Sequence, residues 1–221
     1  MGDALCQKSY VADFLSGRTV KNKGEIEQVL IKENHEAIIP KHLWKAVQLK
    51  LKRRREYMAK HGLRTLGRYQ DAQPFSHHII CGTCGNVYRR RTWYRDGKSV
   101  KVWQCATRYA EKGVPGCGNC NLYERDLYHA FALAWEKVIA DRYQLMPEWQ
   151  RKMGEGNALE ALRARQMMEL TSEHQPTKSL KSELVNKVLD HLLVNRDGSF
   201  EVKFLDGRKT KVPAIIDNCR G

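Results

Sequence analysis

Apolar residues recur at helical spacing in one strongly basic stretch of the chain. Leu43, Val47 and Leu51 follow one another every four residues, just after Pro40, a residue that favours the first turn of a helix. Lys and Arg crowd the following turns as far as Gly62. The pattern therefore predicts a basic amphipathic helix that begins at Pro40 and ends near Gly62.

Strand-like segments precede this helix. Residues 4–14 and 25–32 contain the apolar positions of short strands, and a Lys-Asn-Lys-Gly turn at residues 21–24 lies between them. We expect a β-hairpin in this part of the chain.

A segment without periodicity follows the helix. Residues 63–75 contain Gly67 and Pro74 and remain basic, which is typical of a linker. We therefore divide the chain into a first module, residues 1–62, and a second module, residues 76–221.

The second module begins with short strands around cysteine turns. Residues 87–88 and 100–103 are strand-like and flank a turn at Asp96-Gly97. Helical spacing returns after Glu124, where apolar residues share one face. This arrangement predicts a small β-ribbon covered by a helix.

The rest of the second module shows two helical patterns and a strand pattern. Residues 158–170 and 180–192 have apolar residues at helical spacing. Asp-Gly turns stand on either side of residues 199–205, whose apolar positions alternate, which predicts a closing β-meander. The fold class expected is α+β, with a hairpin and basic helix followed by a β-ribbon domain with packed helices.

Length and hydropathy narrow the class of protein. The 221 residues suffice for one large domain or two small ones. No apolar run approaches the length of a membrane span, and the first residues lack the pattern of a secretory signal. We expect a cytoplasmic protein whose cysteines stay reduced unless a metal binds them.

Positive charge is concentrated in two windows. The chain carries 39 Lys and Arg against 25 Asp and Glu, a net charge of +14. Residues 41–68 contribute +9 and residues 86–104 contribute +5, which is the whole excess. Lys and Arg displace the counterions of nucleic-acid phosphates, so such clustering indicates a polyanionic partner. A solvated face that serves solubility is the alternative, but it gives no reason for the concentration.

Five of the seven cysteines fall within forty residues, at Cys81, Cys84, Cys105, Cys117 and Cys120. The Cys-x-x-Cys turn of the first pair supplies two ligands for tetrahedral zinc. Spacing alone favours a second such pair, Cys117 and Cys120, which leaves Cys105 as a buried thiol. Four protein ligands leave no position for water, so the metal would be structural. Reduced core cysteines, a catalytic zinc and an iron-sulfur cluster are weaker alternatives.

Other chemistry-bearing residues have ordinary interpretations. His77 and His78 lie near the first cysteine pair and are taken as surface or linker residues. Trp93, Tyr94 and Trp103 could stack on single-stranded nucleic acid, but packing in a small ribbon core is the more common role of such residues. No Ser-His-Asp or paired-carboxylate arrangement stands out, so a hydrolase or nuclease lacks support.

Two groups of short segments, taken in their order along the chain, resemble parts of a known protein family. The first group is Gly2-Asp3-Ala4-Leu5, Asn22-Lys23-Gly24-Glu25, Asn34-His35-Glu36-Ala37-Ile38-Ile39 and Leu43-Trp44-Lys45-Ala46-Val47-Gln48. The second group is Pro74-Phe75-Ser76, Cys81-Gly82-Thr83-Cys84-Gly85, Trp103-Gln104-Cys105, Arg108, Cys117 and Phe204-Leu205-Asp206-Gly207. The first group resembles the end of the recombinase domain of large serine recombinases, the phage integrases and mobile-element resolvase-like transposases. The second group resembles the zinc beta-ribbon and closing strands of that family.

The resemblance implies a particular set of zinc ligands. It places the third ligand at Cys105 and the fourth at Cys117, beside Cys81 and Cys84, and leaves Cys120 spare. The expected cofactor is one structural zinc.

The resemblance also implies a partner, double-stranded DNA. In the family the two domains grip successive parts of an attachment site during integration and excision, and the segment that corresponds to residues 60–72 tracks the DNA. We expect contacts, mostly to phosphates, from Lys52, Arg53, Arg54, Arg55, Lys60, Arg64, Arg68, Arg89, Arg90 and Arg91. Other recombinase subunits are further expected partners, whereas no membrane or small-molecule substrate is expected. The alternative is a stand-alone zinc-ribbon module that binds RNA or a protein.

One part of the family pattern has no counterpart in the sequence. The catalytic domain, with its nucleophilic serine and arginine cluster, is not recognisable, and only modest helices stand where many relatives carry a long coiled coil. We therefore assign no catalytic residue and expect that this chain alone does not cut DNA. The resemblance implies a bacterial or phage-encoded protein of the nucleoid.

Overall fold

The structure, a computed structural model, describes most of the chain. The described residues are 2–6, 10–12, 19–21, 29–35, 39–63, 73–95, 97–109, 113–114, 116–172 and 182–215. The helices are α1 (Lys41–Lys60), α2 (Glu124–Ala140), α3 (Arg142–Glu155), α4 (Ala158–Ser172) and α5 (Ser182–Val188). The strands are β1 (Gly2–Cys6), β2 (Tyr10–Ala12), β3 (Thr19–Lys21), β4 (Val29–His35), β5 (Ile79–Cys81), β6 (Tyr88–Arg95), β7 (Lys98–Cys105), β8 (Leu122–Tyr123), β9 (Leu189–Val194), β10 (Phe200–Phe204) and β11 (Lys209–Val212).

The first four strands form two nested antiparallel pairs. β1 pairs with β4, and β2 pairs with β3 inside them. The predicted strand content is confirmed, and the pairing is more elaborate than a single hairpin. The predicted turn continues from Lys21, the last residue of β3, into residues that lie outside the described part of the chain.

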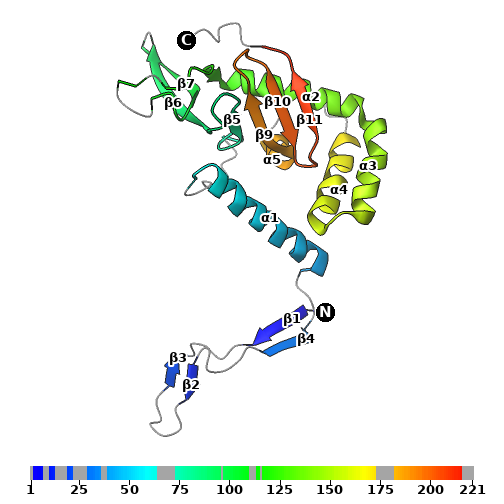
Figure 1. Cartoon of the computed structure of the whole chain (residues 1–221). Coiled ribbons are helices and arrows are strands. Elements are labelled where there is room, and N and C mark those ends of the chain that lie inside the picture. Colours follow the sequence, from blue (N-terminus) through cyan, green and yellow to red (C-terminus); the bar gives the residue numbers. More distant parts are fainter. Residues whose placement is uncertain are drawn as a thin grey trace.

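The predicted basic helix is confirmed. Helix α1 begins directly after Pro40, and the chain turns at Gly62, whose φ of +60° suits glycine. Figure 1 shows α1 running between the first strands and the remaining elements. Ala46 is buried on the face of α1 that meets the second module, where α1 packs against α4.

The core of the second module lies between a mixed sheet and helix α2. The sheet has the order β11-β10-β9-β5, in which β5 runs parallel to β9 and the other neighbours are antiparallel. On α2, Phe131 and Trp135 are buried and pack against Phe204 of β10, with ring centroids 6.2 and 5.9 Å from it. This confirms the predicted helix after Glu124, its inward face and the closing meander.

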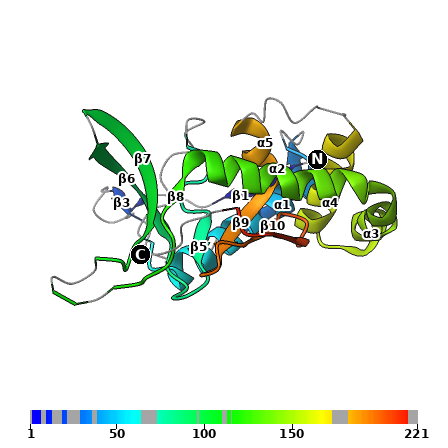
Figure 2. The same ribbon diagram turned by 90° about the horizontal axis from the view of Figure 1, so that it is seen from above.

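A second sheet, of order β6-β7-β8, leads directly into α2. The backbone N–H of Tyr123 donates to Asp126 Oδ2 over 2.8 Å, which caps the start of the helix. Figure 2 shows β6 and β7 projecting near one end of α2, with α3 and α4 at its other end. The sheet confirms the predicted ribbon around Gly97, whose φ is +72°.

Two predictions about helices need correction. Residues 180–192 were expected to be one helix, but among the described residues of this range the helix ends at Val188 and Leu189 begins strand β9. The apolar spacing misled because the buried residues of β9, which are Leu189, Leu192 and Val194, do not alternate strictly. The pairing of β9 with β10 shifts register between Lys203 and Phe204, which breaks the alternation. Helix α3 was not predicted, because Pro147 lies inside it.

The packed core of the second module includes residues that the sequence analysis placed in the linker. Pro74 is buried, and Phe75 is fully buried with its ring 4.9 Å from that of Tyr128. Residues 64–72 lie outside the described part of the chain. Among the described residues, no helix has the length and apolar composition to cross a membrane.

Candidate metal centre and basic surface

A cysteine turn follows strand β5 directly. Cys81 is the last residue of β5, and its carbonyl accepts a hydrogen bond of 2.8 Å from the N–H of Gly85. The N–H of Cys81 donates to the carbonyl of Asn86 over 2.8 Å. Gly85 has a φ of +73°, a conformation that glycine adopts without strain. The turn brings Cys84 back to the same side as Cys81.

Two further cysteines approach the turn from the neighbouring sheet. Cys105 is the last residue of β7, and the chain after it turns so that the N–H of Cys117 donates to the carbonyl of Thr107 over 3.3 Å. Arg108 Nη1 donates to the carbonyl of Asn119 over 2.6 Å. These two hydrogen bonds hold the segment of Cys117 against the end of β7.

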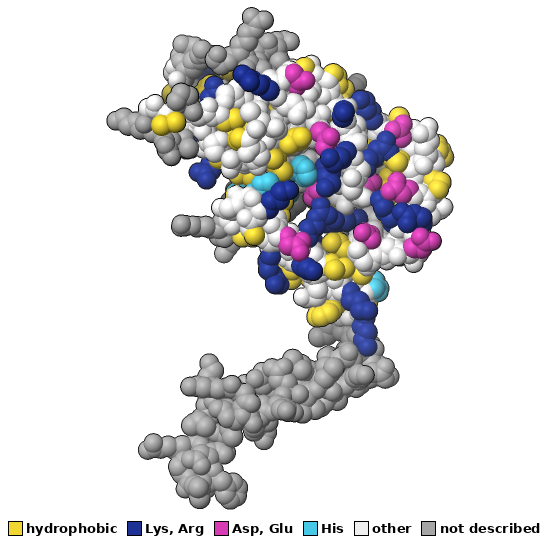
Figure 3. Space-filling view, viewed as in Figure 1, with side chains coloured by type: hydrophobic (Ala, Val, Ile, Leu, Met, Phe, Trp, Pro, Cys, Tyr) yellow, Lys and Arg dark blue, Asp and Glu magenta, His cyan; other side chains and the backbone are white. Residues whose placement is uncertain are grey.

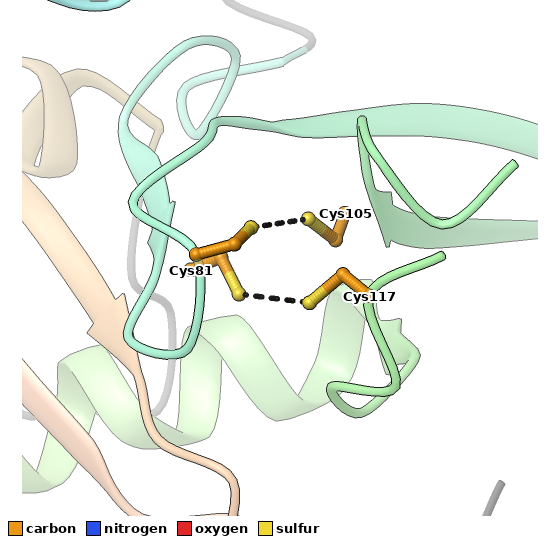
Figure 4. Close-up of side chains that lie close together, drawn as sticks. Cys81, Cys105 and Cys117 are labelled. Carbon is orange, nitrogen blue, oxygen red and sulfur yellow. Dashed lines mark hydrogen bonds between the residues drawn. The ribbon is translucent and has the colours of Figure 1, made fainter. Parts of the chain in front are cut away.

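The four sulfur atoms form one compact group. Figure 4 shows the side chains of Cys81, Cys105 and Cys117 pointing toward one another. The Sγ atoms of Cys81 and Cys117 are 3.6 Å apart, those of Cys84 and Cys105 are 3.3 Å apart, and all four lie within 4.8 Å of one another. Tetrahedral zinc with Zn–S bonds of about 2.3 Å needs sulfur separations of about 3.8 Å. The group therefore fits a tetrahedral thiolate metal.

The protonation of the thiols differs across the group. Burial raises the pKa of the Cys84 thiol, but hydrogen bonds from Thr107 and Asn86 outweigh this effect and lower the pKa to about 6. Burial raises the pKa of Cys105 to about 12. A thiolate is the form that binds a metal, so Cys84 is ready at neutral pH whereas Cys105 must release a proton on binding.

Asn119 connects the sulfur group to the main sheet. Its side chain is buried and its Nδ2 donates both to Cys81 Sγ, over 3.1 Å, and to the carbonyl of Val194 in β9, over 2.9 Å. Thr107 Oγ1 lies 3.2 Å from Cys105 Sγ. The sequence analysis did not single out Asn119 or Thr107. In the sequence each of them is a polar residue two positions after a candidate ligand, and polar residues around a metal site can donate hydrogen bonds to its ligands.

The residues considered as alternative ligands lie outside the four-cysteine group. Cys120 is buried but is not among the sulfurs that lie close together. His78 places its Nδ1 2.7 Å from the carbonyl of Asp190, and the carbonyl of His77 accepts a hydrogen bond from Tyr57 Oη over 2.5 Å. The two histidines therefore take part in contacts with β9 and α1, and the structure assembles the set of cysteines that the family resemblance implied.

The ten basic residues expected to contact DNA fall into three groups. Arg64 and Arg68 lie outside the described part of the chain. Arg53 and Arg90 form ion pairs inside the protein. The exposed residues are Lys52, Arg54, Arg55, Lys60, Arg89 and Arg91.

Two of the arginines expected to contact DNA form ion pairs within the protein. Arg53 Nη2 lies 2.6 Å from Asp190 Oδ2, and Arg90 Nη2 lies 2.9 Å from Glu124 Oε2. Successive residues of a helix point about 100° apart, so Arg53 faces the sheet while its neighbours Lys52 and Arg54 face away from it. In this structure Arg53 joins α1 to β9, and Arg90 joins β6 to the start of α2.

Aromatic side chains on the ribbon correct another expectation. Trp103 is buried, as expected for a ribbon core, but Tyr94 is 83% exposed and Trp93 is 36% exposed. Both lie on β6, which also carries the exposed Arg89 and Arg91. The projecting part of the ribbon therefore presents aromatic and cationic groups together.

The backbone at Gly116 packs closely against the segment that follows Cys105, so a side chain at this position should disturb the cysteine group. A Cβ atom at this position would lie 2.0 Å from the carbonyl oxygen of Arg108 and 2.3 Å from that of Thr107. We expect Gly116→Ala to lower the free energy of unfolding by about 1–3 kcal/mol and to speed metal loss to a chelator, because Cys117 must move with the backbone. Gly118→Ala is the matched control, since nothing lies within 4 Å of its added Cβ. Equal thermal unfolding of the two variants would contradict the prediction.

Comparisons with known proteins give two family matches. Residues 3–54 match the family described as Recombinase, and residues 74–136 match the Recombinase zinc beta ribbon domain. No curated protein matches the chain.

Two solved structures are similar to the chain at 14% identity. "Crystal Structure of a LSR-DNA Complex" has a TM-score of 0.42, with 85% of this chain and 70% of that chain covered. "Sequence Requirements of the Listeria innocua prophage attP site" has a TM-score of 0.33, with 89% of this chain and 62% of that chain covered.

The two family matches follow one another along the chain, and they include the basic helix α1 and the four-cysteine group. The Recombinase match includes most of α1, and the zinc beta ribbon match includes all four clustered cysteines and the basic strands β6 and β7. The chain therefore belongs to the recombinases: a segment of the Recombinase family is followed by a recombinase zinc beta ribbon domain.

Proposed function

We propose that this chain is a DNA-binding portion of a large serine recombinase that docks on the duplex of an attachment site, with one structural zinc in its ribbon. The observation that carries the proposal is the exposed positive charge of α1 and β6 in a chain of the recombinase family. Lys52, Arg54 and Arg55 are exposed on α1, and Arg89 and Arg91 are exposed on β6. Contacts of such residues with phosphates give affinity that depends strongly on salt.

The zinc has a structural role in this proposal. Cys81, Cys84, Cys105 and Cys117 would hold the ion, and the ion supplies a cross-link between the end of β5 and the end of β7. The donor set supports this role, because four thiolates fill a tetrahedral zinc and leave no position for a reacting water. The chain's own part is to position the thiols and to donate hydrogen bonds to them from Asn119.

A second candidate function has one observation in its favour. The exposed rings of Tyr94 and Trp93 on a basic strand are suited to stacking on unpaired bases. A zinc ribbon that binds RNA or single-stranded DNA would use this surface. Helix α1 gives this alternative less support, since it exposes Trp44 near its start but the later turns expose the charges of Lys52, Arg54 and Arg55, which suit phosphates.

The two functions predict different preferences for nucleic acid. We expect the zinc-loaded chain to bind a labelled duplex more tightly than either of its strands at the same salt concentration, by about tenfold or more. Fluorescence anisotropy with duplex, single-stranded DNA and RNA of one sequence measures this preference. Tighter binding of single strands, lost in Tyr94→Ala, would support the alternative and contradict the proposal.

A further inference from the structure

Two polar side chains of helix α1 reach the second module from the same face of the helix. Arg53 and Tyr57 are four residues apart, a spacing that places both on one face. Arg53 Nη2 lies 2.6 Å from Asp190 Oδ2 in β9, and Tyr57 Oη donates to the carbonyl of His77 over 2.5 Å. Burial, followed by the negative charge of Asp190, raises the pKa of Tyr57, so its hydroxyl keeps the proton that it donates. These two contacts, which we call the α1 junction, join the helix to β9 and to the segment before β5.

The two acceptors of the α1 junction are fixed to each other. His78 follows His77 directly, and its Nδ1 lies 2.7 Å from the carbonyl of Asp190. The carbonyl of His78 accepts a hydrogen bond from the N–H of Leu192 over 2.7 Å, next to the parallel pairing of β5 with β9. The segment of His77 and strand β9 therefore offer α1 a single, connected pair of acceptors.

Apolar packing gives α1 little additional hold on the second module. The structure describes every residue of α1, and Ala46 is the only buried one. Leu43, Val47 and Leu51 are exposed. In Figure 3, His, Lys and Arg side chains gather where α1 lies against the second module. The position of α1 therefore depends largely on polar contacts.

His77 has an unusual backbone conformation at the point where Tyr57 binds. Its φ is +64°, and among the described residues it is the only one other than glycine with a positive φ. For a residue with a Cβ atom this conformation is disfavoured by about fivefold or more. The turn is held from the other side by Phe75, which is fully buried and whose carbonyl accepts a hydrogen bond of 3.0 Å from the N–H of His78. Because such strain persists only where surrounding contacts hold it, the hydrogen bond from Tyr57 opposes the strain at His77.

We propose that Tyr57 is a positioning residue for DNA binding, and that its hydrogen bond holds His77 in the left-handed conformation that docks α1 on the second module. The docked helix keeps the exposed cations of α1 in a fixed position relative to those of β6. Two surfaces held in this way bind one duplex with less loss of conformational freedom than two surfaces that move independently. The positioning role rests on the proposed function, whereas the docking of α1 does not.

The docking of α1 is tested by the removal of one oxygen atom. We expect Tyr57→Phe to speed amide hydrogen exchange of α1 by about two- to tenfold, the range by which one hydrogen bond changes an equilibrium. His77→Gly should slow this exchange by about two- to fivefold, because glycine adopts a positive φ without strain. Tyr143→Phe is the matched control, since Tyr143 of α3 is 80% exposed and loses the same atom. Mass spectrometry of the zinc-loaded chain measures the exchange rates.

Duplex binding tests the positioning role. We expect Tyr57→Phe to weaken binding of a labelled duplex by about two- to tenfold, and the double variant of Tyr57→Phe with His77→Gly to regain most of that affinity. The slope of log K against log salt should stay unchanged in each variant, because no phosphate contact is removed. Measurements well below the melting temperature of each variant keep the chain folded, so a change in stability alone does not alter the affinity.

The outcomes separate this inference from the proposed function. Equal exchange of α1 in Tyr57→Phe and Tyr143→Phe would overturn the docking role of Tyr57, and so would faster exchange in His77→Gly. If Tyr57→Phe does not fold, the exchange of His77→Gly decides the docking role. Duplex binding that stays constant while the exchange changes would overturn the positioning role and leave the proposed function intact. The expected exchange rates in a chain that binds no duplex would support the docking of α1 and contradict the proposed function.

Discussion

Replacing Cys105 or Cys117 with serine is expected to abolish zinc binding and to unfold the ribbon, whereas Cys120→Ser should retain about one zinc per chain. The sulfurs of the first two belong to the compact group, and Cys120 does not. Structural zinc sites contribute about 10–16 kcal/mol of apparent binding free energy, which is comparable to or larger than the whole stability of an ordinary domain, about 5–15 kcal/mol. Loss of one thiolate therefore removes much of what holds β5 to β7.

The measurement is the metal content of each purified variant together with its thermal unfolding. Cys81→Ser and Cys84→Ser should behave like Cys105→Ser. Cys120→Ser is the control for the loss of a buried sulfur atom near the site. A zinc that is lost with Cys120 but kept without Cys105 would mean that spacing, rather than the family pattern, gives the ligand set.

The affinity of the site for zinc should fall as the pH is lowered. Zinc binds thiolates, so protons compete with the metal and the apparent affinity for zinc falls as the pH is lowered. Because burial raises the pKa of Cys105 to about 12, this thiol stays protonated in the metal-free protein at neutral pH and releases its proton when zinc binds. Zinc titrations in buffers of different ionisation enthalpy measure that proton release. No change in affinity between pH 8 and pH 6 would contradict the thiolate site.

Local patterns were sufficient to predict the elements whose periodicity matches their burial. The helix after Glu124 buries its face of regularly spaced apolar residues, as predicted. The helix after Pro40 is also present, but Leu43, Val47 and Leu51 are exposed and Ala46 is its buried residue. The β-turns at Gly97, Gly198 and Gly207 have positive φ values, as the Asp-Gly pairs predicted. These features depend on residues close in sequence.

Features that depend on distant residues could not be predicted in the same way. Leu189–Val194 is a strand because it lies between β5 and β10, and neither neighbour is visible in the local pattern. Helix α3 tolerates Pro147 in a helix anchored by the buried Trp149, whose Nε1 donates to Asp206 far along the chain. Tertiary packing outweighed local propensity in both cases.

In the candidate site, too, some features depend on residues close in sequence and others on distant residues. The Cys81 turn could be recognised from its spacing, but the choice between Cys105 and Cys120 required knowledge of a fold, because the end of β7 and the segment of Cys117 meet only in three dimensions. The basic residues could be counted in the sequence, but the sequence did not show which of them are exposed and which form ion pairs inside the protein. Arg53 was indistinguishable from Arg54 in the sequence until the acid opposite α1, Asp190, was identified.

The combined replacement Lys52→Glu, Arg54→Glu and Arg55→Glu is expected to weaken duplex binding by at least about 100-fold at physiological salt. These side chains are exposed on α1, so their reversal leaves the buried face of the helix and the Arg53–Asp190 ion pair unchanged. Each lost phosphate contact lowers the salt slope by about 0.9, which gives about 2.7 for three contacts. The loss should be similar for unrelated duplex sequences, because phosphate contacts carry no base specificity.

The matched control reverses Arg151, Arg165 and Lys187, which are exposed on α3, α4 and α5. Net charge changes by the same amount in both triple variants, so a long-range effect of charge alone would weaken both equally. The surface ion pairs of Arg151 with Glu155 and of Lys187 with Glu183 contribute little to stability, so the control should remain folded. A control variant as weak as the α1 variant would show that the protein attracts DNA through its overall charge and that α1 is not a docking surface, whereas a selective loss would place the duplex along this helix.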